Sequence, residues 1–184
     1  FMKQMAFTLM ELMIVIVIIG ILSAVGMVMF GGQAEKAKIT ATKANFKNIE
    51  KKLLISITAC MSGIEVTFGP FCTTGCSPKT RTCNTSKFPT SYLNADSLTW
   101  NVYREVKLNA KNPYDAAATK PIDWSNGRCP PANPSKGQII LGYGYKNNTC
   151  GMAGNVSCIK ANIGDSDKDG SDDYLEKEIN LCEF

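Results

Sequence analysis

An uninterrupted apolar run near the N-terminus limits what this chain can fold into. No residue at positions 12–30 is charged, and nearly all of them are Ile, Val, Leu, Met or Phe. About twenty apolar residues at roughly 1.5 Å each match the roughly 30 Å core of a bilayer, so a helix here can span a membrane. A secretory signal peptide would end in a small-residue cleavage site, and none is evident near Phe30. We therefore expect the segment to stay in the mature protein.

The apolar run is preceded by a short motif that contains one carboxylate. Residues 7–24 read Phe-Thr-Leu-Met-Glu-Leu-Met-Ile-Val-Ile-Val-Ile-Ile-Gly-Ile-Leu-Ser-Ala. This order resembles the N-terminal motif of type IV pilins and type II secretion pseudopilins. The resemblance is specific but ends there, as expected for a family whose globular part varies widely. In that family the aromatic residue of the motif, at the position of Phe7 here, starts the mature chain, and the apolar helix forms the core of a filament.

The same motif gives Glu11 a candidate role in assembly. A carboxylate beside an apolar core is costly unless it is paired, and intramembrane ionisable residues are usually functional. The resemblance implies pairing with the N-terminal ammonium of a neighbouring subunit. The sequence as printed begins at Phe1, which we expect to be the mature end, although cleavage between Ala6 and Phe7 is the alternative. An amine at Phe1 would lie about two helical turns from Glu11, so Lys3 is a second candidate partner. The competing interpretation is that Glu11 only marks the membrane interface.

Composition excludes several functions and indicates an oxidising compartment. The chain has no histidine, which removes His-based catalysis and His metal sites, and its net charge of +4 gives no sign of nucleic-acid binding. All eight cysteines follow the apolar run. An even number in the exported part predicts four disulfides, in any of 105 pairings, and a thiolate metal site is the rival interpretation. These cysteines are Cys60, Cys72, Cys76, Cys83, Cys129, Cys150, Cys158 and Cys182.

Hydrophobic periodicity divides the chain into a long helix and a head. We expect a helix over residues 1–58, with a membrane or filament-core half at 7–30 and an amphipathic half at 33–58, and a globular head at 59–184. Apolar residues of the second half recur every three or four positions, with lysines between them that form a basic, solvated face. Gly26, Gly31 and Gly32 weaken the helix locally, so we expect any local unwinding of the helix to occur at these glycines.

The head is predicted to be a small, disulfide-rich antiparallel sheet packed on the amphipathic half of the helix, which makes the fold class α+β. Enrichment in β-branched and aromatic residues predicts strands at 98–103 and 138–145, with shorter ones near 64–68 and 156–159. Residues 126–134 are rich in proline and glycine and predict a loop.

A second specific motif, at residues 165–176, predicts a calcium site. Calcium takes six to eight oxygen ligands, and side-chain oxygens at alternating positions of a short loop can surround it. Gly170 allows the sharp turn of an EF-hand-like loop. The competing interpretation is a solvated acidic turn, but so many carboxylates repel one another without a cation. The candidate Ca²⁺ ligands are Asp165, Asp167, Asp169, Ser171, Asp173 and Glu176.

The surroundings of this loop suggest a stabilising role. We expect a helix at 174–181 after the loop, and a disulfide between Cys158 and Cys182 would enclose it. Calcium and disulfides together would rigidify a small head.

These features predict a structural, non-enzymatic protein: a major pilin that polymerises into an extracellular type IV filament of identical subunits. The resemblance implies residence in the inner membrane before assembly, and prepilin peptidase and the pilus assembly machinery as partners. A major pseudopilin of type II secretion and a membrane-anchored, calcium-dependent adhesin are the alternatives.

Overall fold

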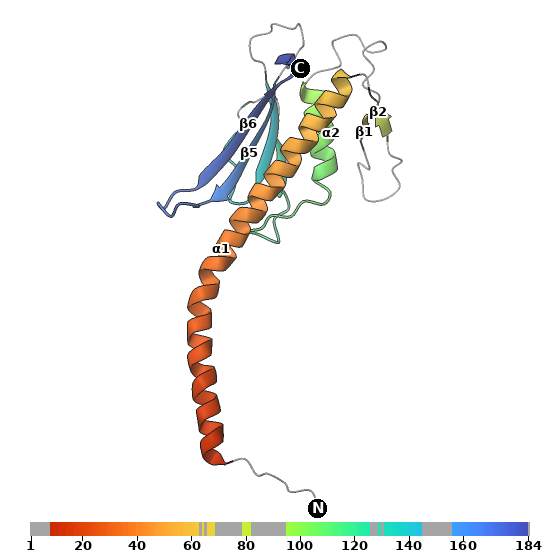
Figure 1. The fold of residues 1–184 in the computed structure, drawn as a ribbon. Helices are drawn as coiled ribbons and strands as arrows, with labels where there is room; N and C mark the ends of the chain where they lie inside the picture. The colour runs from red at the N-terminus through yellow and green to blue at the C-terminus, as the bar shows by residue number, and fades with distance from the viewer. Residues whose placement is uncertain are drawn as a thin grey trace, which may run out of the picture. The chain divides into compact units, whose positions relative to one another are not determined.

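The computed structural model describes residues 8–62, 64, 66–68, 79–81, 95–125, 129, 131–144 and 156–183. The chain separates into two compact units, Phe1–Ala37 and Lys38–Phe184 (Figure 1). A single helix, α1 (Leu9–Met61), contributes to both of them. It continues through Gly26, Gly31 and Gly32, so the local unwinding predicted at these glycines is not observed.

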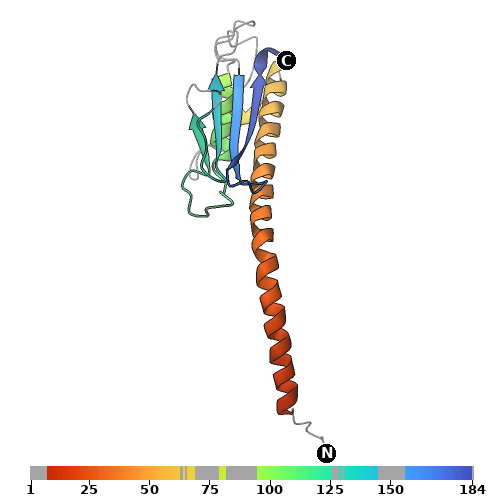
Figure 2. The same ribbon diagram turned by 90° about the vertical axis from the view of Figure 1, so that its left-hand side faces the viewer.

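The second unit holds a four-stranded sheet and a separate hairpin. The sheet order is β3-β4-β5-β6, and Figure 2 shows these strands side by side with α2 behind them. The sheet is mixed: β3 pairs with β4 in parallel, and the other pairs are antiparallel. The α+β class is therefore confirmed, but the prediction of a purely antiparallel sheet is wrong. In chain order the elements after α1 are β1 (Val66–Phe68) and β2 (Lys79–Arg81), which form the hairpin, then α2 (Ala95–Val106), β3 (Ile122–Ser125), β4 (Ile139–Gly144), β5 (Val156–Gly164), β6 (Asp173–Asn180) and the short 3-10 helix η1 (Leu181–Glu183).

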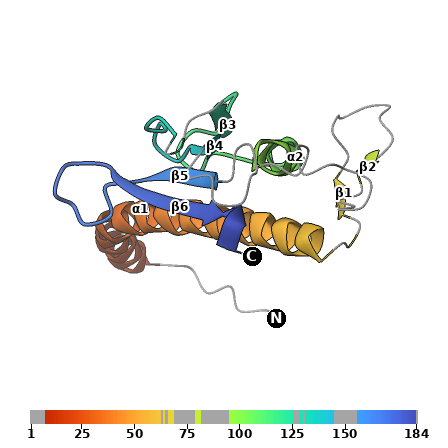
Figure 3. The same cartoon turned by 90° about the horizontal axis from the view of Figure 1, so that it is seen from above.

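Both helices cover the same face of the sheet. From α2, the Thr99 hydroxyl meets the Ser157 hydroxyl of β5 at 2.6 Å, and from α1, Glu50 forms an ion pair with Lys177 of β6 at 3.9 Å. Ser157 and Lys177 lie on one face because Lys177 is directly opposite Ile159, two residues along from Ser157. Figure 3 shows α1 along β5 and β6, and α2 beside β3 and β4. The core forms here. Its α1 side consists of Phe46, Ile49, Leu53, Ile57 and Cys60.

The opposite face of the sheet is covered by the connection between β3 and β4. Parallel neighbours require a crossover, and the described residues of this one are fixed to β5 by a disulfide and by hydrogen bonds. Cys129 forms a disulfide with Cys158, and the buried Asn162 side chain donates a hydrogen bond to the Pro134 carbonyl at 3.1 Å. Every residue of β5 is consequently buried. The expectation of a loop at 126–134 holds for its described residues, which belong to no helix or strand.

Residues 98–103 were predicted to be a strand, and this prediction is wrong, because they form the middle of α2. Leu98, Thr99, Val102 and Tyr103 are buried, whereas Trp100 is exposed. This spacing of one, three and four residues is that of a helix face, and packing against β3 and β4 outweighs the strand preference of aromatic and β-branched residues. The strands predicted at 138–145, 156–159 and 64–68 are confirmed in position by β4, β5 and β1.

The core side of α1 supplies a direct test of this packing. Leu53 is fully buried, whereas Ile55 is 57% exposed. We expect Leu53→Ala to lower the free energy of unfolding by about 3 kcal/mol, and the melting temperature of the full chain by about 10 °C, because it leaves a cavity. Circular dichroism in detergent measures the shift. The matched control, Ile55→Ala, should change stability by less than about 0.5 kcal/mol. Equal shifts for the two variants would contradict the packing described.

Candidate assembly motif and acidic loop

The start of α1 is closed by a reciprocal set of hydrogen bonds between Thr8 and Glu11. The Glu11 carboxylate accepts from the Thr8 N–H at 3.3 Å and from the Thr8 hydroxyl at 3.2 Å. The Glu11 N–H in turn donates to the Thr8 hydroxyl oxygen at 3.3 Å. This is a capping box, and the positive end of the helix dipole adds to the stabilisation of the carboxylate. Sequence reasoning missed Thr8, although the pattern Thr-x-x-Glu could have revealed it.

The first unit presents an apolar surface that nothing within it covers. Within the described residues, Leu9–Gly26 is the one helical stretch long and apolar enough to cross a membrane, with a mean hydropathy of 2.6 and no burial. Such a surface requires lipid or other protein chains around it. Phe1, Lys3 and Phe7 lie outside the described residues, so the pairing of Glu11 with an amine or with Lys3 stays a prediction.

The acidic loop, residues 165–173, connects β5 to β6 at one end of the sheet. Carboxylate oxygens of Asp165, Asp167 and Asp173 lie within 4.8 Å of one another. The Asp165 carboxylate accepts hydrogen bonds from the Asp169 and Gly170 N–H groups, both at 3.1 Å. Gly170 has a φ of 93°, which explains the need for glycine at this turn. Three of the predicted ligands are therefore brought together.

Two aspartates of the loop, Asp169 and Asp173, accept hydrogen bonds from serines. The Ser171 hydroxyl and N–H donate to the Asp169 carboxylate and lower the pKa of Asp169. The Ser166 hydroxyl and N–H likewise lower the pKa of Asp173. Both carboxylates are therefore ionised at lower pH than an ordinary aspartate, which suits binding to a cation. Asp169 and Ser171 are not part of the group of three carboxylates.

Glu176 lies apart from the other candidate ligands. Residues 174–181 were predicted to be a helix, and this is wrong, because Asp173–Asn180 forms strand β6. Asp173 and Glu176 are three residues apart on this strand, so their side chains leave opposite faces and their backbones are separated by about 10 Å. Glu176 instead forms an ion pair with Lys160, its partner on β5.

The base of the acidic loop depends on Asn162, which sequence reasoning also missed. Asn162 is buried, with only 2% of its surface exposed. Its amide group donates to the Asp172 carboxylate at 2.9 Å, and its carbonyl oxygen accepts from the Gly164 N–H at 2.9 Å. These contacts fix the bulge where β5 leaves the sheet.

The disulfide prediction has a mixed outcome. Cys158 is bonded to Cys129, so the proposed bridge from Cys158 to Cys182 is wrong. Cys60, in the last turn of α1, is also disulfide-bonded. Cys72, Cys76, Cys83 and Cys150, together with the side chain of Cys182, lie outside the described residues.

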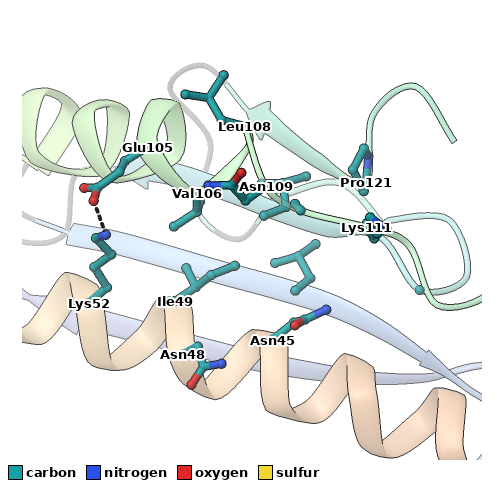
Figure 4. Close-up of a pocket in the computed structure, with 14 residues that line it drawn as sticks. Asn45, Asn48, Ile49, Lys52, Glu105, Val106, Leu108, Asn109, Lys111 and Pro121 are labelled. Carbon is teal, nitrogen blue, oxygen red and sulfur yellow. Dashed lines mark hydrogen bonds and ion pairs between the residues drawn. The ribbon is translucent and has the colours of Figure 1, made fainter. Parts of the chain in front are cut away.

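A groove of about 750 Å³ lies between α1 and the residues that follow α2 (Figure 4). The ion pair between Lys52 and Glu105 bridges its two walls, and Asn45, Asn48 and Asn109 line its rim. This groove exists because α2 ends at Val106 while α1 continues along the sheet. Its lining can donate and accept hydrogen bonds around an aliphatic floor.

The N-terminal segment matches the prokaryotic N-terminal methylation motif over residues 2–27. No curated protein and no solved structure matches the chain. The chain therefore carries the prepilin signal of type IV pilins and pseudopilins in this segment, together with a capped and exposed apolar helix. The motif implies processing by prepilin peptidase and points to a structural rather than a catalytic protein. Membrane anchoring through Leu9–Gly26 before assembly fits the same class.

Proposed function

We propose that this protein is a structural subunit, a major pilin, that polymerises into an extracellular type IV filament. The observation that carries the proposal is the uncovered apolar helix at Leu9–Gly26, which starts with a single carboxylate in a capping box. A surface of this kind can exchange lipid for the helices of other subunits without changing its own conformation. Burial of its apolar side chains against neighbouring helices holds the filament together.

The proposed mechanism is non-catalytic. Before assembly, the apolar helix lies in the inner membrane with the head in the periplasm. Prepilin peptidase and the assembly machinery then process the chain and move it into a bundle of helices. Glu11 fixes the axial register of each subunit by pairing with a cation of its neighbour, because an unpaired carboxylate in an apolar bundle is costly.

Electron microscopy of material sheared from the cell surface, with mass spectrometry of its main 20.0 kDa band, tests this function. Thin filaments composed of this protein are the expected result. Protein found only in the membrane fraction would contradict it. In that case, co-purification with a secretion complex would favour the pseudopilin, and its absence would favour a solitary, calcium-dependent adhesin.

We further propose that the acidic loop binds Ca²⁺. The three carboxylates of Asp165, Asp167 and Asp173 support this proposal because like charges at this separation repel without a cation. Asp169 and backbone carbonyl groups of the loop are the candidates for the remaining oxygen ligands. Glu176 is the weakest of the candidates, because it faces Lys160.

Calcium is therefore expected to stabilise the head. At a concentration 100 times its dissociation constant, it should raise the free energy of unfolding by about 2.7 kcal/mol, and the melting temperature by about 8 °C. Differential scanning calorimetry of the full chain in detergent, with calcium and with EGTA, measures this shift.

Two substitutions distinguish a calcium site formed by the three carboxylates from a complete EF-hand-like loop closed by Glu176. Asp167→Asn should remove the calcium-dependent shift, because it takes a charge from the group of three carboxylates. Glu176→Gln should retain it, whereas a loop closed by Glu176 would lose it. No shift in the unsubstituted protein at millimolar calcium would contradict the calcium site itself.

A further inference from the structure

The solvent-facing side of α1 in the second unit carries a row of lysines, which we call the lysine face: Lys43, Lys47 and Lys51. They are spaced four residues apart, so they lie on one side of the helix, and all three are exposed. In the described part of the chain, neither Lys47 nor Lys51 forms an ion pair. Like charges at this spacing destabilise a helix, so an acidic partner would relieve a cost present in the single chain.

The lysine face continues into an exposed apolar residue. Ile55 follows Lys51 by four residues, and 57% of it is accessible. Charges next to an exposed apolar side chain are typical of the polar rim and apolar centre of a protein interface.

A surface of the opposite charge is present on the same chain. The acidic loop contains five aspartates and one lysine, and most of its residues are exposed. The acidic loop therefore offers the lysine face a surface of complementary charge. Among the described residues of the same chain, no carboxylate forms an ion pair with Lys47 or Lys51.

We propose that the lysine face of one subunit binds the acidic loop of a second copy of this chain. The two surfaces differ, so the contact is heterologous, and such contacts build open helical assemblies rather than closed dimers. The proposal rests on the proposed filament and adds to it a specific contact between heads. Lys47 and Lys51 supply the charge, and Ile55 supplies the apolar contact beside them.

Zero-length cross-linking tests the contact directly. Filaments assembled from a mixture of ¹⁵N-labelled and unlabelled full chain are treated with a carbodiimide in the presence of EGTA, digested and analysed by mass spectrometry. Cross-links from Lys47 or Lys51 to residues 165–173 should include pairs of mixed isotope, which arise only between two copies. A link between Glu50 and Lys177, whose side chains form an ion pair within one head, should occur without isotope mixing and is the internal control.

Charge reversal gives an independent measure. Lys47→Glu/Lys51→Glu should lower the yield of sheared filament by about tenfold or more, because it places like charges opposite each other. The matched control, Lys111→Glu/Lys120→Glu, makes the same change of charge elsewhere on the head and should retain the yield. The melting temperature of each variant verifies folding.

Well-formed filaments that lack the mixed cross-links would overturn the contact while leaving the filament proposal intact. A normal filament yield from the lysine-face variant would overturn it as well. Complete absence of filaments from the unsubstituted chain would instead overturn the proposed function.

Discussion

Glu11→Ala is expected to give a folded, membrane-held subunit that no longer forms normal filaments. Glu11 is the only charged residue at positions 4–34, so its removal leaves nothing in this segment to fix axial register by charge. Breaking a buried ion pair costs about 3–5 kcal/mol, which corresponds to a hundredfold or greater loss in an association constant. Electron microscopy of sheared material and immunoblotting of the membrane fraction measure the two parts of this result.

Two further variants separate the charge of Glu11 from its capping role. Glu11→Gln keeps a capping-box residue but removes the charge, and it should lose filaments as the alanine variant does. Thr8→Val removes the cap but keeps the charge. It should weaken the start of the helix by about 1 kcal/mol and largely retain assembly. Wild-type filaments from Glu11→Gln would show that the cap matters and that the charge does not.

Removing the disulfide between Cys129 and Cys158 is expected to have the largest effect on the stability of the head. The bond closes a segment with a sequence separation of 29 residues, and closure of such a loop contributes about 3–4 kcal/mol. The double variant Cys129→Ala/Cys158→Ala should therefore shift the urea midpoint of the full chain by about 2 M. A shift of less than about 0.5 M would contradict this.

Hydrogen exchange can localise this loss. Without the disulfide, the crossover connection is held to β5 by the hydrogen bonds of Asn162 with Pro134, Gly137 and Gln138. We expect faster exchange on the connection at 131–136, with little change in α2, which covers the opposite face. Equally faster exchange in both helices and the sheet would show that the disulfide stabilises the whole head, and not only the connection between β3 and β4.

The long helix was predictable because its signals are local. An apolar run, a change to amphipathic spacing and the absence of proline all lie within the helix itself. The cluster of Asp165, Asp167 and Asp173 was predictable for the same reason, since alternating aspartates before a glycine specify a tight loop.

The remaining errors have identifiable physical causes. Strand β6 was mistaken for a helix because the calcium motif suggests an exiting helix, although Leu175 and Ile179 face the core while Glu176 and Glu178 are exposed. That alternation is the period of a strand. The parallel pairing of β3 could not be predicted, because four residues contain too little periodicity and the pairing depends on a distant crossover. The partner of Cys158 likewise depends on that crossover.

The disulfide at Cys60 has a mechanical consequence. In a filament under tension, force along α1 shears the helix against the sheet, and buried side chains such as Leu53 and Ile57 resist by packing alone. Cys60 lies beyond both of them, buried in the last turn of the helix, and is covalently bonded to another cysteine of the chain. The end of the helix is therefore joined to the rest of the chain by a disulfide as well as by the backbone. A pull on the helix would act on two covalent connections at its end.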